Sequence, residues 1–274
     1  MGKTASFGFQ EAAISDPEAK RLLDRCKEFK EGLFSGSCAF VVLDCETTGL
    51  SAMRDFPYEL AALFAVADDS GVKVEHAFHT YIDWTRDNVA DPADFNARLT
   101  ASTLAMQEKF PDVKRPTLPQ LQLIGKHPYE ALSAFKGLVE TFFNHYSATH
   151  KVFTCGHNIF NFDANVLHHN YTKIRLQSPT SSQLLDTGLL IKAAQMNPTA
   201  VPSPSYGPID WILEVGKVRA KGLFWNLNEF CTQKFNLDAL LPAYIREAPH
   251  TALTDAWKFL TLFRLFHQPG KFTK

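Results

Sequence analysis

A run of apolar residues that ends in two carboxylates constrains the fold of this chain more than any other stretch. Residues 40–43 are aromatic and aliphatic types that suit a strand covered on both faces, and residues 47–49 then favour a turn. Asp44 and Glu46 are two residues apart and therefore share one side of the strand. Two carboxylates this close repel each other at neutral pH unless a cation bridges them or one binds a proton. We therefore predict a divalent metal site at this strand end. The alternative is that both acids point into water.

Further strands and helices are expected on either side of this run. Residues 59–67 and 72–82 have the patterns of two more strands with short links, which predicts an antiparallel meander. Residues 85–127 contain four prolines and weak periodicity, so we expect short helices and loops there, with a role that the sequence leaves open. Residues 128–146 carry the wide apolar stripe of a long helix, and residues 151–155 form a further strand.

Length and composition favour one α/β domain with extensions. The 274 residues are 45% hydrophobic and can bury a large core. The 28 basic and 29 acidic residues give a net charge of −1, so a nucleic-acid partner must be held by a local basic surface and metal ions. The five cysteines follow no zinc-ligand spacing, which predicts reduced thiols in an intracellular protein. Cytoplasm, nucleus and organelle are not distinguished.

Two later clusters of polar residues stand at the ends of expected elements. The first follows the strand 151–155 and contains His157, Asn158 and Asp163, where Asn158 alternatively is a turn residue that caps the next helix. The second places His250 five residues ahead of Asp255, at the start of a closing helix with an apolar stripe. In the alternative interpretation His250 is an ordinary residue near a helix start.

In this order, the three clusters resemble the motifs of the DnaQ-like, or DEDD, 3′–5′ exonucleases, and the last resembles their His-x4-Asp (DEDDh) form. Three residues separate Asn158 from Phe162, a spacing that resembles the three-prime repair exonuclease type. The resemblance covers about residues 38–266. It implies an α/β, RNase H-like mixed sheet in which an antiparallel three-strand meander joins parallel strands, flanked by helices. We expect a DnaQ-like domain over residues 36–270 and an N-terminal helical extension over residues 1–35.

The resemblance also implies a chemistry for these residues. Four carboxylates without a His or Cys ligand cluster favour Mg²⁺ or Mn²⁺ over zinc. Two ions would clamp the attacking and leaving oxygens at phosphorus. The ligands would be Asp44, Glu46, Asp163 and Asp255, and His250 would accept the proton of the attacking water. Substrate contacts would come from Thr47, Thr48, Gly49, Leu50 and Asn158.

The implied activity is release of nucleoside 5′-monophosphates from single-stranded or frayed 3′ ends, with DNA slightly favoured over RNA. An RNA-trimming exoribonuclease of the same family is the first alternative. A catalytically silent module that binds nucleic acid or protein is the second, although such a module has no need to keep like charges together. Homodimerisation and the roles of residues 197–222 stay open, including a basic run at 217–221 that contacts phosphates or forms a solvated face.

The N-terminus fits a lipidation pattern but no membrane span. Gly2 and Ser6 match the N-myristoylation pattern, and one acyl chain gives only reversible membrane binding. We treat myristoylation at Gly2 as a minor alternative. No stretch approaches the ~20 apolar residues of a transmembrane helix, and a signal-peptide core is absent from the N-terminus. We therefore expect a soluble protein.

Overall fold

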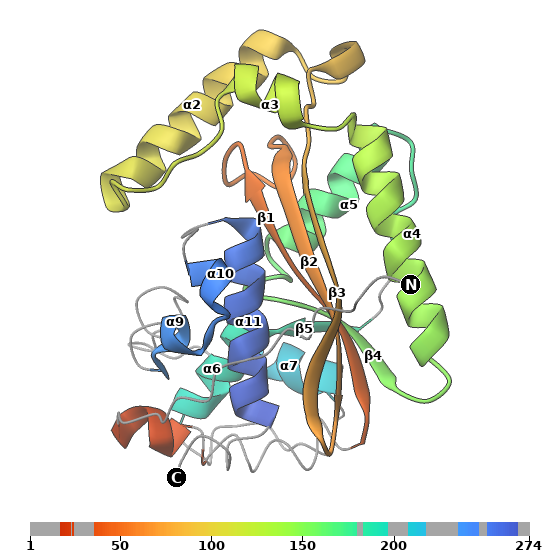
Figure 1. The fold of residues 1–274 in the computed structure, drawn as a ribbon, viewed down its shortest axis with the longest axis vertical. Helices are drawn as coiled ribbons and strands as arrows, with labels where there is room; N and C mark the ends of the chain where they lie inside the picture. Colours follow the sequence, from red (N-terminus) through yellow and green to blue (C-terminus); the bar gives the residue numbers. More distant parts are fainter. Residues whose placement is uncertain are drawn as a thin grey trace.

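A single five-stranded mixed sheet forms the centre of the protein (Figure 1). The computed structural model describes residues 17–22, 24, 36–179, 183–196, 208–217, 235–246 and 251–267. The strand order is β3-β2-β1-β4-β5. The pairs β1–β2 and β2–β3 are antiparallel. The pairs β1–β4 and β4–β5 are parallel. The strands are β1 (Cys38–Thr47), β2 (Pro57–Asp68), β3 (Gly71–Tyr81), β4 (Lys151–Gly156) and β5 (Leu184–Asp186). The predicted mixed sheet is confirmed.

Helices cover both faces of this sheet (Figure 1). Side chains alternate along β1, so that Phe40 and Val42 pack in one core and Val41 and Leu43 in the other. The first core includes α11, whose Phe263 ring lies 4.2 Å from the Phe40 ring. The helices on that side are α6 (Thr187–Gln195), α7 (Pro208–Lys217) and α11 (Ala252–His267), and those on the other are α4 (Pro128–Tyr146) and α5 (Asp163–Lys173).

A helical cover lies over the end of the sheet where β1 finishes (Figure 1). It consists of η1 (Arg86–Asn88), α2 (Pro92–Lys109) and α3 (Leu118–Ile124). The expectation of only short helices here is wrong for α2, which has 18 residues. Pro92 stands in the first turn, where a missing N–H costs nothing, and Asp91 caps the helix by accepting from the Asp94 N–H. Only Phe95 and Leu99 of α2 are buried, which explains its weak apolar periodicity.

Two short helices, α9 (Leu237–Leu240) and α10 (Ala243–Arg246), precede α11. Several predictions fall outside the described residues: Gly2, His250, residues 218–221 of the basic run and most of the 1–35 extension. The boundaries 1–35 and 36–270 stay predictions. Within the part of the chain that the structure describes, no helix has the length and apolarity needed to cross a membrane.

Candidate active site

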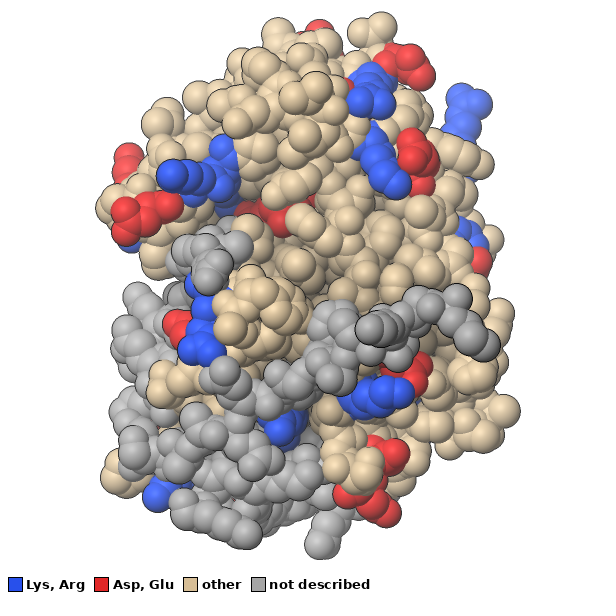
Figure 2. Space-filling model, in the orientation of Figure 1, with Lys and Arg blue, Asp and Glu red and all other residues tan. Residues whose placement is uncertain are grey.

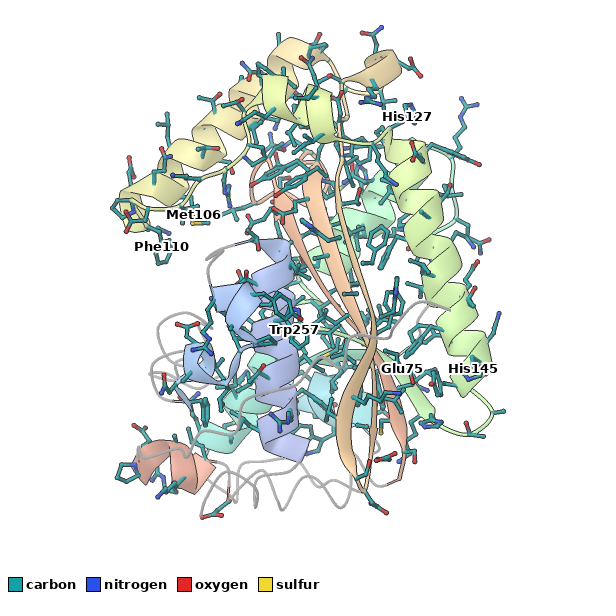
Figure 3. The ribbon with its side chains drawn as sticks, viewed as in Figure 1. Glu75, Met106, Phe110, His127, His145 and Trp257 are labelled. Carbon is teal, nitrogen blue, oxygen red and sulfur yellow. The ribbon has the colours of Figure 1, made fainter. Side chains whose placement is uncertain are left out.

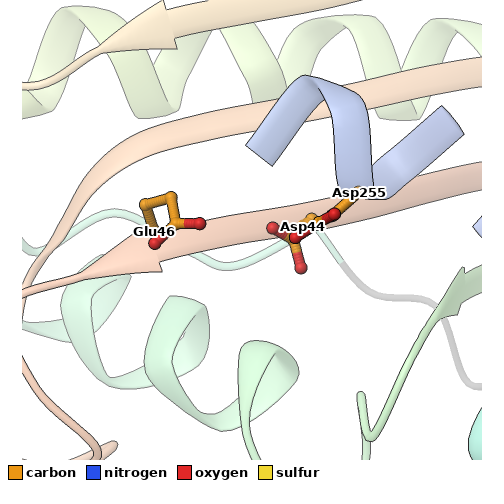
Figure 4. Close-up of side chains that lie close together, drawn as sticks. All are labelled: Asp44, Glu46 and Asp255. Atoms are coloured by element: carbon orange, nitrogen blue, oxygen red, sulfur yellow. The ribbon is translucent and has the colours of Figure 1, made fainter. Parts of the chain in front are cut away.

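Three of the predicted acids meet where β1 and α11 come together. Asp44 and Glu46 project from the same side of β1, and Asp255 lies in the first turn of α11, which packs against that side. One carboxylate oxygen from each acid lies within 4.8 Å of the others (Figure 4). The strand periodicity and the packing of α11 on β1 therefore bring together residues that are more than two hundred positions apart in the sequence.

The fourth acid, Asp163, joins the cluster from the opposite layer. It is the first residue of α5, it is buried, and its Oδ1 accepts a hydrogen bond from the Cys45 N–H at 3.2 Å. Cys45 is the residue between Asp44 and Glu46. All four acids line one pocket of ≈ 530 Å³. Figure 2 shows acidic side chains at the bottom of a hollow in this face of the molecule.

Burial and nearby carboxylates favour the protonated forms of Asp44, Glu46 and Asp163. The pKa of Asp44 is raised well above its usual range, first by burial and then by the neighbouring Asp163, Asp255 and Glu46 carboxylates. Burial raises the pKa of Glu46 to about 8 even though the Arg115 cation opposes that shift. Burial likewise raises the pKa of Asp163 to about 7, against the hydrogen bond from Cys45. Carboxylates in this state gain strongly from a bound cation.

Two basic side chains, those of Arg115 and Lys258, contact the acidic cluster. Nη2 of Arg115 lies 2.5 Å from Oε2 of Glu46, and Nζ of Lys258 lies 3.1 Å from Oδ1 of Asp255. The Lys258 contact is an ion pair without hydrogen-bond geometry, since the buried Oδ1 accepts no hydrogen bond from the described residues. Buried carboxylate oxygens with unused lone pairs fit a hard divalent cation such as Mg²⁺ or Mn²⁺. The residues present therefore suit the predicted metal.

The loop before α5 shapes a second wall of this pocket. Asn158 lies in a turn with a positive φ of 57°, and its Oδ1 accepts from Nδ2 of Asn161, so the expected turn is confirmed and the expected helix cap is wrong. Asp186 holds the loop, because its Oδ1 accepts from the N–H of Asn158 at 3.0 Å and from that of Gly188 at 2.9 Å. The His157 ring stacks on Phe259 with 5.7 Å between ring centroids. His157, Asn158 and Asp186 all line the pocket.

The turn after β1 is tightly built around Asp55. Its Oδ2 accepts from the Ser51 N–H at 2.7 Å, and a Cβ on Gly49 would lie 2.6 Å from that same oxygen. Thr48 is buried, its N–H donates to the Phe56 carbonyl, and its hydroxyl accepts from the Phe56 N–H. The N–H and the hydroxyl of Thr48 thus already have hydrogen-bond partners within the protein, whereas Leu50 is 91% exposed.

Thr47 lies at the base of the same turn, where its hydroxyl donates to the Gly49 carbonyl at 2.6 Å. The N–H groups of Gly49 and Leu50 form no hydrogen bond with the described residues. Among the predicted substrate contacts, Gly49 and Leu50 therefore offer backbone N–H groups that could donate to a ligand. The substrate roles of Thr47, Thr48, Gly49, Leu50 and Asn158 stay predictions, and so does the role of His250.

The comparisons with known proteins agree with this fold. Residues 41–122 match the RNase_T family, described as exonuclease. Exonuclease I has a similar structure, with a TM-score of 0.54 and 15% identity over 86% of this chain and 42% of that one. Escherichia coli exonuclease I in complex with a dT13 oligonucleotide is similar too, with a TM-score of 0.52 and 14% identity over 85% of this chain and 42% of that one. No curated protein shows significant sequence similarity.

Sheet, helical layers and acidic cluster thus define an RNase H-like exonuclease fold, and the resemblance to the DnaQ-like exonucleases is confirmed. The three-prime repair type is a finer prediction that these matches do not distinguish. This chain spans less than half the length of exonuclease I. The similarity to that enzyme shows the fold alone. The substrate, the direction of digestion and the use of a metal are therefore matters for proposal.

Proposed function

We propose that this protein is a metal-dependent 3′–5′ exonuclease that releases nucleoside 5′-monophosphates from single-stranded or frayed 3′ ends, with DNA slightly favoured. The observation that carries the proposal is the pocket in which Asp44, Glu46, Asp163 and Asp255 meet. A protein that only binds nucleic acid gains nothing from four clustered carboxylates that repel one another and the phosphate backbone. The same acids are useful where cations must be held against a phosphodiester.

Each residue has a defined task in this proposal. The four acids would hold two Mg²⁺ or Mn²⁺ ions, which when bound supply charge stabilisation for the attacking and leaving oxygens. His250 would accept the proton of the attacking water, since imidazole is the side chain whose usual pKa lies near neutrality. Leu50, exposed on a turn held by Asp55, would pack against the terminal base. Asn158 would orient the last nucleotide from the opposite wall of the pocket.

Single-stranded DNA is the substrate we favour. The solved complexes of exonuclease I with dA16 and dT13 concern that protein, and they support the proposal through the shared fold. The net charge of −1 is compatible with such a substrate when a local basic surface and metal ions hold it.

Digestion of oligonucleotides labelled at the 5′ end tests the proposal. Single-stranded DNA and RNA of one sequence are incubated with Mg²⁺, with Mn²⁺ or with EDTA. We expect a ladder that shortens from the 3′ end, mononucleotide 5′-phosphates as product, faster digestion of DNA and none in EDTA. A 3′-phosphate on the oligonucleotide should slow the first cleavage. Faster digestion of RNA would identify an exoribonuclease. Binding of the oligonucleotides without cleavage in either metal would refute the proposed exonuclease activity.

A further inference from the structure

Arg115 links the segment between α2 and α3 to the predicted metal ligand Glu46. Its Nη2 donates to Oε2 of Glu46 at 2.5 Å, and the two side chains are only 7% and 12% exposed. The position also leaves Nε of Arg115 buried without a hydrogen-bond partner among the described residues. A buried ion pair and an unpaired donor each cost stability, and proteins tend to retain such costs at functional positions.

A second contact connects Arg115 to α2, so that the arginine is braced against a helix and does more than balance the charge of Glu46. Nη1 of Arg115 donates to Oγ of Ser102 in α2 at 2.6 Å, and Oγ of Ser102 donates to the Thr47 carbonyl at 3.1 Å. Arg115 and Ser102 therefore connect α2 to the last two residues of β1 through one continuous network. A planar guanidinium with two fixed partners holds a carboxylate in one orientation, which a flexible ammonium does not do.

The backbone that carries Arg115 is itself anchored. Val113 is buried, its N–H donates to the Phe110 carbonyl at 3.0 Å, and its own carbonyl accepts from Nε2 of Gln107 at 3.4 Å. Figure 3 places Met106 and Phe110 at the C-terminal end of α2, from which the chain returns toward α3. The guanidinium also lies 5.8 Å from the centre of the Tyr58 ring. Little conformational freedom remains to be lost when the site is used.

The contact leaves one oxygen of Glu46 available. Oε2 is held by Arg115, whereas Oε1 accepts no hydrogen bond from the residues that the structure describes. We propose that Arg115, braced by Ser102, is a positioning residue that orients the Glu46 carboxylate so that one oxygen faces the cluster formed with Asp44 and Asp255. This inference rests on the proposed metal-dependent function. The competing explanation is that Arg115 only neutralises charge.

Calorimetric titration with Mn²⁺ alone separates the two explanations. A pure counter-ion competes with a metal ion, so its removal should tighten Mn²⁺ binding. Loss of a partner that orients a ligand instead typically weakens metal binding by about 10–100-fold. We expect Arg115→Met and Arg115→Lys each to weaken Mn²⁺ binding by at least about tenfold. Lysine keeps the positive charge but lacks the planar guanidinium that binds Glu46 and Ser102 together.

Two further variants complete the experiment. Ser102→Ala keeps the ion pair and removes the brace, so we expect a smaller loss of about fivefold in Mn²⁺ affinity. Lys136→Met removes a cation that pairs with Glu140 on α4, away from the site, and should bind Mn²⁺ as the parent does. Melting in EDTA checks that each variant is folded. If Arg115→Met does not fold, Arg115→Lys and Ser102→Ala decide the question.

Parental or tighter Mn²⁺ binding in Arg115→Met would overturn the positioning role. Parental binding in both Arg115→Lys and Ser102→Ala would do the same, because charge alone would then suffice. These outcomes leave the proposed function intact as long as the parent protein binds Mn²⁺. A parent protein that binds no Mn²⁺ would instead overturn the proposed function together with this inference.

Discussion

The carboxylate of Asp163 accepts a hydrogen bond at 3.2 Å from the backbone N–H of Cys45, the residue of β1 that separates Asp44 from Glu46 in the sequence. The acid from α5 is therefore fixed by the backbone of β1 and does not depend on a cation for its position. The site is preformed by the docking of α5 and α11 on the sheet. Its electrostatic cost is present in the metal-free protein and is relieved when a cation binds.

Two substitutions at Asp163 separate its structural and chemical roles. Asp163→Asn keeps an oxygen that accepts from Cys45 and removes one repelling charge, so its metal-free melting temperature should equal or exceed that of the parent. Asp163→Ala leaves the buried Cys45 N–H unpaired and should be less stable than Asp163→Asn by about 1–3 kcal/mol. Urea unfolding in EDTA measures the difference. Equal stability of the two variants would show that the hydrogen bond is unimportant.

The raised pKa values predict how stability depends on pH. The folded protein holds protons on Glu46 up to about pH 8 and on Asp163 up to about pH 7, whereas unfolded carboxyls release them near pH 4. The folded state then binds more protons than the unfolded state, so the free energy of unfolding falls as pH rises through this window.

Melting in EDTA from about pH 5 to about pH 8.5 checks this dependence. The parent should lose more stability across the range than Asp44→Asn, in which one repelling acid is absent. Saturating Mn²⁺ should flatten the loss because the cation stabilises the ionised acids. Identical pH profiles for parent and Asp44→Asn in EDTA would contradict the assigned repulsion.

Gly49 and Gly137 form a matched pair of glycines. A Cβ at Gly49 would meet Oδ2 of Asp55 at 2.6 Å, whereas one at Gly137, inside α4, would meet nothing within 4 Å. We expect Gly49→Ala to destabilise the protein by about 1–3 kcal/mol and Gly137→Ala to stabilise it by up to about 1 kcal/mol. Denaturant unfolding of both variants measures this. Equal effects would mean that the turn before Leu50 is not tightly built.

His250 is predicted to be the general base. His250→Ala should slow turnover by about 10²–10⁴-fold, while metal and single-strand binding stay near parental values. The acid limb of the pH–rate profile should flatten, because the group that must lose a proton is gone. Single-turnover kinetics measure the effect. A rate within about threefold of the parent would leave His250 as an ordinary residue near a helix start.

The sequence patterns and the family resemblance predicted the mixed sheet and pointed to the four acids that line one pocket, whose role as metal ligands stays a prediction. The buried strand that carries Asp44 and Glu46 follows from local periodicity, whereas Asp163 was identified by the resemblance of its segment to the second exonuclease motif. The position of Asp255 in the first turn of α11 followed from the apolar stripe of that helix. These residues meet because the strands and helices that carry them can pack in few ways.

The arrangement around the acids was not predictable in the same way. Arg115 lies in a segment without periodicity and reaches Glu46 across 69 residues of sequence. Nothing local distinguishes it from other arginines. The length of α2 was missed because Pro92 reads equally well as a loop residue or as a helix start. Asp186 caps the start of α6, which is a local role, but its bond to the Asn158 N–H depends on the tertiary fold.

The exonuclease activity of Asp44→Asn shows whether the acidic cluster performs metal-dependent catalysis. The substitution removes a ligand at the centre of the acidic cluster and barely changes side-chain volume, and Asp69→Asn, on the exposed turn after β2, serves as the matched control. The measurement is the rate of 3′-end digestion of a 5′-labelled single-stranded DNA with Mg²⁺. We predict parental digestion by Asp69→Asn and none by Asp44→Asn, with both variants folded. Digestion by Asp44→Asn at close to the parental rate would contradict the account.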